Sequence, residues 1–219
     1  WGTSKSSGSF STLFESRILR ALQYKETPFE ITVNQQNGKK AGRKVFGLSP
    51  AISAHIADHF PQTGQPRETV YLSCGSSISI DLPDGGVDLV VTDPPFFDNV
   101  HYSELADFFY VWQKMYFDEP CSAADSTTRH IEEVQDGDVA SFASKLGRVF
   151  TECYRVLRDD GLLVFSYHHS RQEGWYAVAD AVLGSGFTFV QAQPVKSEMA
   201  GAMPKSQAKS PIDLDVLLV

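Results

Sequence analysis

The strongest constraint on the fold comes from residues 87–102, VDLVVTDPPFFDNVHY, where an apolar run ends at an acid and two prolines. A short continuous apolar run is typical of a strand that is buried on both faces of a parallel sheet. Pro94 and Pro95 have a fixed φ and no amide hydrogen, so neither a strand nor a helix continues through them. The chain therefore has to leave the sheet at Asp93, and the two prolines make that exit stiff.

From residue 69 onward the sequence predicts strands that alternate with helices. Apolar residues at helical spacing predict helices that begin near Ser103, after Asp138 and near Trp175, and we expect Gly161 to end the second. Phe108, Phe109 and Trp112 lie at helical spacing, which favours burial in the core. Short apolar runs predict strands at residues 69–73, 87–91, 162–167, 187–195 and 213–219. This alternation predicts a three-layer α/β sheet.

Residues 1–68 have a different pattern, and we expect them to form a separate helical and hairpin region ahead of an α/β part at 69–219. Residues 10–22 carry an apolar helical stripe, and two β-like runs flank a polar loop that contains Asn37-Gly38. Ser49-Pro50 predicts a further helix up to Pro61. His55 and His59 lie four apart on it but have no evident third ligand, so no metal site is predicted.

The amino-acid composition narrows the functional classes to which the chain can belong. The 219 residues are 42% hydrophobic, contain no apolar run long enough to span a bilayer and begin without a secretory signal, so we expect no membrane association and a cytoplasmic location. The three cysteines are widely spaced without a CxxC pair, which argues against a disulfide framework or zinc ribbon. A net charge of -8 would repel a nucleic acid at long range, so basic groups would have to be local, as at residues 39–44, or come from another subunit.

The stiff exit suits one kind of chemistry. Ligands of α/β sheets bind beyond the carboxyl ends of the strands, where Asp93 falls. The Asp93 carboxylate and the Pro94 carbonyl can together accept both hydrogens of an exocyclic amine, while Phe96 offers a flat face for a ring. Methyl transfer to an aromatic amine needs such positioning because the nitrogen lone pair is delocalised into the ring.

The tetrapeptide Asp93-Pro94-Pro95-Phe96 resembles the catalytic motif of the S-adenosylmethionine-dependent amino-methyltransferases that modify adenine N6 or cytosine N4 in DNA. Two longer strings, TDPPFFDNVHYSELADFFYVW at 92–112 and RVLRDDGLLVFSYHH at 155–169, are similar to a subgroup of large prokaryotic adenine-specific DNA methylases. The similarity covers residues 69–219. It implies a Rossmann-like methyltransferase sheet with a final antiparallel strand, incomplete at its N-terminal half.

The resemblance also implies roles for individual residues. The four residues of the motif would be catalytic: Asp93 and Pro94 would bind the target amine and Phe96 would stack on a base flipped out of duplex DNA. Asp at the first position is commoner among adenine N6 enzymes, so adenine is favoured over cytosine. Residues near the motif or at the end of the next strand would contact the substrate, namely Phe97, Asn99, His101, Tyr102 and His168.

The residues expected to bind the cofactor depart from the family pattern. S-adenosylmethionine is the implied methyl donor, bound by Asp93 and by the loop Cys74-Gly75-Ser76, but the family usually has Gly-Asp in this loop. The glycine-rich loop that follows the family's first strand is also not found. We therefore expect the family's first half to lie upstream of Trp1, or on a partner subunit, and this chain alone to bind S-adenosylmethionine poorly.

Two other interpretations remain open. The same fold, with a related Pro-Pro-aromatic motif, also serves RNA and protein methylation. A non-catalytic, methyltransferase-like module that binds nucleic acid would explain the departure on the cofactor side, although the intact motif opposes it. If the chain is an enzyme, we expect direct methyl transfer with no covalent intermediate and no role for a cysteine.

Overall fold

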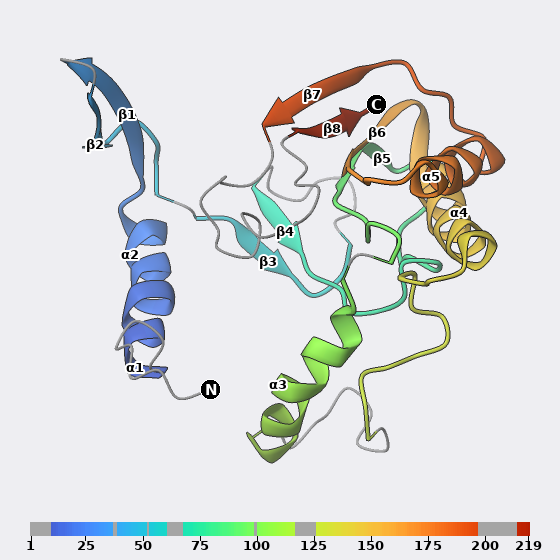
Figure 1. The fold of residues 1–219 in the computed structure, drawn as a ribbon. Coiled ribbons are helices and arrows are strands. Elements are labelled where there is room, and N and C mark those ends of the chain that lie inside the picture. The colour runs from blue at the N-terminus through green and yellow to red at the C-terminus, as the bar shows by residue number, and fades with distance from the viewer. Residues whose placement is uncertain are drawn as a thin grey trace. The chain divides into compact units, whose positions relative to one another are not determined.

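The computed structural model describes residues 10–36, 39–51, 53–60, 68–98, 100–116, 126–196 and 214–219 (Figure 1). The chain divides into two compact units, Trp1–Leu72 and Ser73–Val219, and each is described by itself. The division falls after Leu72, so the strand at Thr69–Tyr71, which the sequence grouped with the α/β part, belongs to the first unit.

The second unit is built on a mixed sheet of four strands in the order β5-β6-β8-β7 (Figure 1). Its strands are β5 (Val87–Thr92), β6 (Leu157–Tyr167), β7 (Ala192–Lys196) and β8 (Leu214–Leu218). β5 and β6 are parallel, with Thr92 opposite Phe165, whereas β8 is antiparallel to both β6 and β7. The antiparallel pairing of the last strand agrees with the sequence prediction, and parallel pairing brings the carboxyl ends of β5 and β6 to the same edge.

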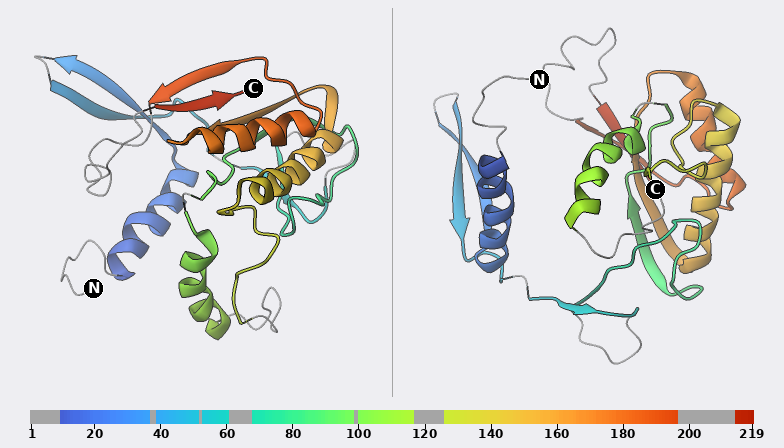
Figure 2. Two further views of the ribbon diagram at one scale, coloured as in Figure 1. Left: turned by 45° about the vertical axis from the view of Figure 1, so that its right-hand side comes forward. Right: turned by 90° about the horizontal axis from the view of Figure 1, so that it is seen from below.

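Two helices, α4 (Val139–Val156) and α5 (Gln172–Gly184), pack together on one face of this sheet (Figures 1 and 2). The Asp138 carboxylate caps α4 by accepting from the Ser141 amide at 2.8 Å, as the sequence predicts. Inward side chains of β6 meet those of the helices in one hydrophobic core, whose main members are Phe142, Leu146, Phe150, Leu163, Phe165, Tyr167, Val178 and Val182.

The predicted end of α4 at Gly161 is wrong. The helix ends at Val156, and β6 begins directly at Leu157, where the backbone becomes extended. Gly161 lies inside β6, where a Cβ atom would stand 2.9 Å from the Leu157 Cδ2 atom and 3.0 Å from the Arg158 carbonyl oxygen. The glycine therefore permits a close backbone approach within the strand.

Strand side chains on the other face of the sheet are exposed in the part of the chain that the structure describes. Leu89 and Val91 of β5 are 51% and 71% exposed, and Leu162 of β6 is also exposed. The sequence predicted a strand buried on both faces and a three-layer arrangement. The exposure of Leu89 and Val91 contradicts burial of β5 on both faces. The described residues form a mixed α/β sheet with α4 and α5 as one helical layer, which is compatible with a methyltransferase fold, and the third layer stays a prediction.

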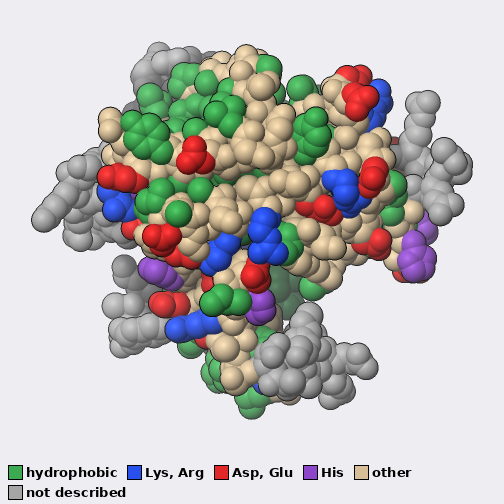
Figure 3. Space-filling model, turned by 90° about the vertical axis from the view of Figure 1, so that its right-hand side faces the viewer, with side chains coloured by type: hydrophobic (Ala, Val, Ile, Leu, Met, Phe, Trp, Pro, Cys, Tyr) green, Lys and Arg blue, Asp and Glu red, His purple; other side chains and the backbone are tan. Residues whose placement is uncertain are grey.

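Opposite charges are interspersed on the surface of this unit. On the face shown in Figure 3, Lys and Arg side chains lie beside Asp and Glu side chains. Lys145 pairs with Asp136 at 2.9 Å, and Arg158 pairs with Asp88 at 2.6 Å. These cations are therefore engaged within the molecule, in line with the acidic balance of the chain.

Helix α3 (Tyr102–Tyr116) follows the diproline segment and is held by its Asp107. This carboxylate accepts hydrogen bonds from the Thr128 amide at 2.6 Å and from the hydroxyls of Thr127 and Thr128. These bonds, that from the Thr128 amide foremost, lower the pKa of Asp107 to about 2. The expected core side chains on α3 are instead 52–62% exposed, namely Phe108, Phe109 and Trp112.

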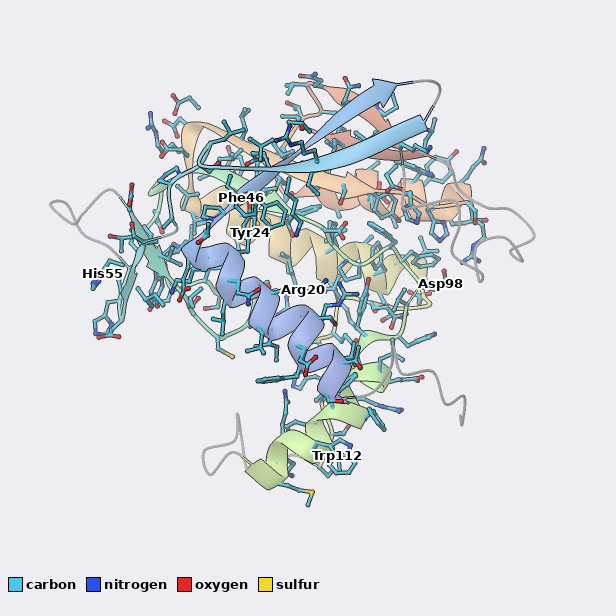
Figure 4. The ribbon with its side chains drawn as sticks, turned by 90° about the vertical axis from the view of Figure 1, so that its left-hand side faces the viewer. Arg20, Tyr24, Phe46, His55, Asp98 and Trp112 are labelled. Atoms are coloured by element: carbon cyan, nitrogen blue, oxygen red, sulfur yellow. The ribbon has the colours of Figure 1, made fainter. Side chains whose placement is uncertain are left out.

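The first unit contains a helical segment followed by a hairpin, as the sequence predicts. The segment consists of α1 (Phe10–Leu13), a π-helical stretch at Phe14–Leu19 and α2 (Arg20–Glu26), and the antiparallel hairpin consists of β1 (Phe29–Gln36) and β2 (Lys39–Phe46). The hairpin tip at Asn37-Gly38 lies outside the described residues. The Phe29 ring joins helix and hairpin by contacting Tyr24 and Phe46, both labelled in Figure 4.

The helix predicted to run from Pro50 to Pro61 is wrong. This segment holds a short strand, β3 (His55–Ala57), parallel to β4 (Thr69–Tyr71), and the His55 amide donates to the Glu68 carbonyl at 2.8 Å. A helix of this length is marginal without tertiary packing, so strand pairing prevails. His55 and His59 do not share a helix face, and no group of three potential metal ligands occurs among the described residues.

The fold predicts that the stability of the protein depends strongly on the core around α4. Phe150 is fully buried and its ring packs against Phe165 at 5.2 Å between centroids, so Phe150→Ala should lower the free energy of unfolding by about 3–5 kcal/mol. Leu183→Ala on α5, where the side chain is 57% exposed, should cost less than about 1 kcal/mol. Urea denaturation followed by circular dichroism measures both, and equal losses would contradict this placement of the core.

Candidate active site

The candidate site lies where β5 ends. Asp93 is exposed, Pro94 behind it is buried, and Pro95 and Phe96 are half-buried. Because β5 and β6 are parallel neighbours, the last residues of β6 lie beside this segment. Residues 93–96 are called the tip below.

The Asp93 side chain is held by β6. The Ser166 hydroxyl donates a short hydrogen bond to the Asp93 Oδ1 atom. Thr92 and Phe165 are direct partners in the sheet, so the next residue on each strand continues this alignment. The bond leaves Oδ2 of Asp93 without a hydrogen-bond partner in the described part of the chain, so it is available to accept from a ligand.

The Phe96 ring is fixed by aromatic contacts on its β6 side. Its centroid lies 5.4 Å from that of Tyr167, with the rings perpendicular, and 4.4 Å from that of His168, with the rings tilted by 49°. Tyr167 is itself immobilised, since its hydroxyl donates to the Gly174 carbonyl at 3.0 Å and it is fully buried. Burial raises the pKa of Tyr167, so its hydroxyl stays protonated and keeps this bond.

Of the predicted substrate residues that the structure describes, His168 has a ring contact with the tip. Its Nδ1 atom lies 2.7 Å from the Oδ1 atom of Asp215, on β8. Both atoms are buried, and neither is hydrogen-bonded in the described part of the chain, so the two form a close polar contact without hydrogen-bond geometry. Sequence analysis identified His168 but missed Asp215, which lies far away in the chain.

Phe97 occupies a different place from the one that the sequence predicts. Its side chain is only 2% exposed and packs against Phe142 and His169, with the Arg171 guanidinium 5.4 Å from the ring centroid. Its φ is 54°, a left-handed conformation that is unfavourable for a bulky residue. The Phe97 ring therefore anchors the tip to the core and offers no surface to a substrate.

A second polar cluster holds the chain just beyond the tip. The Arg171 Nη2 atom donates to the Asp98 Oδ2 atom at 2.5 Å, and His169 Nε2 lies 3.5 Å from Asp98 Oδ1. The hydrogen bond from Arg171 is the main cause that lowers the pKa of Asp98. The sequence analysis missed Asp98, Ser166 and Arg171. Alternation along the predicted strand at 162–167 was the available signal for Ser166.

Among the other predicted residues, those that the structure describes show no hydrogen bond or ring contact with the tip. His101 and Tyr102 are exposed at the start of α3, and Asn99 lies outside the described residues. Cys74 and Gly75 directly precede a turn that begins at Ser76, in which the Ser79 amide donates to the Ser76 carbonyl at 3.1 Å. No contact between this turn and Asp93 occurs in the described part of the chain.

Two cavities among the described residues do not supply an S-adenosylmethionine pocket beside Asp93. A nucleoside cofactor needs a pocket beside the reacting group, but the cavities found here lie elsewhere. One of about 410 Å³ is lined by residues of 157–165 and 186–190, and another of about 450 Å³ lies over Trp175 and Phe189. Neither is lined by Asp93 or by the turn at 74–76.

Thiol chemistry is not supported at this site. Cys153 is buried in α4, and desolvation raises its pKa to about 11, so the reactive thiolate is scarce at neutral pH. Cys74 is exposed but has no described contact with the tip. Cys121 lies outside the described residues. The tip therefore offers hydrogen-bond acceptors and an aromatic ring, which suit positioning of an amine.

The combination of residues at the tip defines a class of enzyme site. An acid and two prolines at the carboxyl end of a parallel strand, followed by an aromatic ring, make an amino-methyltransferase tip of the Asp-Pro-Pro-aromatic type. Residues 87–213, more than half of the chain, match the family model described as DNA methylase, of the N6 and N4 amino-methyltransferase type. The chain belongs to this family of DNA methylases, whose members in general use S-adenosylmethionine. None of the curated protein sequences matches it.

The ion pair between Asp98 and Arg171 predicts that the stability of the fold depends on pH. In Arg171→Gln, the pKa of Asp98 should rise toward its usual value near 4, because the charged donor is lost. A lowered pKa in the folded state stabilises the fold above the unfolded pKa, and this contribution disappears as the pH falls through the lowered value. The stability advantage of the wild type over Arg171→Gln should thus be largest above about pH 4 and shrink on acidification.

Two measurements check this expectation: an NMR titration of the Asp98 carboxyl carbon and thermal unfolding between pH 2 and pH 7. Glu173→Gln, a change to an exposed acid on α5, serves as the control and should leave the Asp98 titration in place. An unchanged Asp98 pKa in Arg171→Gln would show that the ion pair does not form in solution.

Proposed function

We propose that this chain positions the exocyclic amine of a DNA base for methylation, with adenine N6 as the favoured target. The observation that carries the proposal is the Asp93 carboxylate, exposed at the end of β5, fixed by Ser166 and placed next to Phe96 in a member of a DNA methylase family. The first-position Asp supports adenine over cytosine.

Each part of the tip has a separate task. Oδ2 of Asp93 and the Pro94 carbonyl accept the two amine hydrogens, which directs the nitrogen lone pair toward the methyl donor. Phe96 stacks on the base, a contact worth about 1–3 kcal/mol in proteins that bind single strands. Such stacking offsets much of the few kcal/mol needed to flip a base out of a duplex.

The donor in this proposal is S-adenosylmethionine, which would supply an electrophilic methyl group. Because these two cavities lie away from Asp93, the proposal assigns to this chain the binding of the amine. A contribution from the loop Cys74-Gly75-Ser76, and from an upstream part or a partner subunit, stays a prediction. A cytoplasmic location stays a prediction as well. No helix among the described residues has the length and apolar character needed to span a bilayer.

Asp93→Ala should abolish transfer if the carboxylate binds the amine. We expect a loss of at least about 100-fold in kcat, since an interaction that positions the reacting group in the transition state is removed. Asp88→Ala, which removes an exposed acid from the same strand, should keep near-wild-type activity. Incorporation of labelled methyl groups by the protein as its complete gene encodes it, with S-adenosylmethionine in excess, measures both variants.

The same assay separates the alternative functions. Duplex DNA, single-stranded DNA, RNA and a protein extract are offered in parallel, and digestion of the product identifies the methylated base. Labelling of RNA or protein alone would replace the DNA proposal with another substrate of the same fold. Wild-type activity in Asp93→Ala would remove the tip from the mechanism, and no transfer to any substrate would favour a non-catalytic module.

The hydrogen bond from Ser166 predicts a smaller and more specific loss. Ser166→Ala frees the Asp93 carboxylate to rotate, so kcat should fall about tenfold, as for a bond to a charged group. Ser166→Thr keeps the hydroxyl and should recover most of the activity. Steady-state kinetics check the pair, with thermal unfolding as the control for folding. Equal kcat values in Ser166→Ala and the wild type would contradict a positioning role.

A further inference from the structure

His168 and Asp215 form a half-buried polar pair, in which His168 contacts Phe96 of the tip, and neither residue has a role in the proposed binding of the amine. β8 runs antiparallel to β6 with Tyr167 opposite Val216, so the next residues outward, His168 and Asp215, lie opposite each other. Their side chains are only 22% and 21% exposed, and 2.7 Å separates Nδ1 from Oδ1.

This pair has the features of an orienting contact. Nδ1 of His168 and Oδ1 of Asp215 are buried and lie 2.7 Å apart, a close polar contact that lacks hydrogen-bond geometry, and neither atom is hydrogen-bonded in the described part of the chain. A buried carboxylate oxygen next to a ring nitrogen favours the tautomer that carries its proton on Nδ1, and it fixes the direction of the ring. The orientation of the His168 ring therefore depends on Asp215.

The His168 ring in turn contacts the Phe96 ring. Its centroid lies 4.4 Å from that of Phe96, closer than the Tyr167 ring at 5.4 Å. Tyr167 is held by its bond to Gly174 and by Trp175 at 5.1 Å between centroids. Among the described residues, the Tyr167 ring is held by the core, and the His168 ring has the Asp215 carboxylate as its close polar contact.

We propose that Asp215 and His168 are positioning residues for base recognition: Asp215 fixes the His168 ring, and this ring holds Phe96 at the angle that stacks on the flipped base. The inference rests on the proposed function and extends it to a residue of the neighbouring strand β8. It makes base stacking depend on a carboxylate two side chains away from the substrate.

A double-mutant cycle tests whether His168 and Asp215 act on base binding through Phe96. The variants are His168→Ala, Asp215→Leu and Phe96→Ala, alone and combined, with Asp215→Asn as the conservative change, because its amide oxygen still accepts from Nδ1. His59→Ala, at an exposed histidine of the first unit, is the matched control. The DNA is one that the wild type methylates, with the target base replaced by 2-aminopurine, whose fluorescence rises when it leaves the stack.

We expect His168→Ala and Asp215→Leu each to reduce the fluorescence rise and to increase KM for DNA about tenfold, within the range that one base-aromatic contact accounts for. The effect on kcat should be smaller. Asp215→Asn should keep most of the signal, and His59→Ala all of it. In the Phe96→Ala background, neither change should reduce the signal or raise KM further, because the ring on which they act is absent.

Additive losses in the cycle would overturn the inference, since the pair would then act independently of Phe96. Wild-type KM in Asp215→Leu would overturn it too. If His168→Ala does not fold, His168→Phe keeps a ring without the Nδ1 contact and should show the same loss as Asp215→Leu. A wild type that methylates no DNA defeats the proposed function and this inference together, whereas an active wild type with an additive cycle defeats this inference alone.

Discussion

Parallel pairing of β5 with β6 is the interaction on which the site depends. It carries two segments that are distant in the chain, residues 93–96 and 166–168, to the same edge of the sheet. Without this register the Ser166 hydroxyl would not meet Asp93, and the ring of His168 would not meet Phe96. The core that α4 and α5 form with β6 stabilises the register, so the burial of residues such as Phe150 supports the geometry of an exposed carboxylate.

Rigidity at the tip has several independent sources. The two prolines restrict the backbone, buried Phe97 anchors the chain immediately after them, and Arg171 holds Asp98 one residue further on. The unfavourable left-handed φ of Phe97 persists because its ring is packed between Phe142 and His169. A site that works by positioning an amine needs such rigidity, because misplaced acceptors would leave the lone pair pointing away from the donor.

Local patterns predicted the elements whose contacts are local. The Asp138 cap and the apolar stripe of α4 follow from spacing, and the position of Asp93 at a strand end follows from the two prolines. Contacts between distant segments could not be predicted from local sequence patterns. Asp215, for example, lies next to His168 because β6 pairs with β8. Strand burial on both faces and the helix over residues 50–61 failed because both depend on what packs against them. Phe97 was placed in the substrate site because a tip sequence gives no sign of a positive φ.

The central claim is that a base binds against Phe96 beside Asp93. Photocrosslinking measures this most directly: oligonucleotides that carry 8-azidoadenine are irradiated with the protein, and the modified peptides are mapped by mass spectrometry. The account predicts labelling of the peptide that contains residues 93–102, centred on Phe96, with loss of that label in Phe96→Ala. Labelling confined to the hairpin of the first unit or to α5, with the tip unmodified, would contradict it.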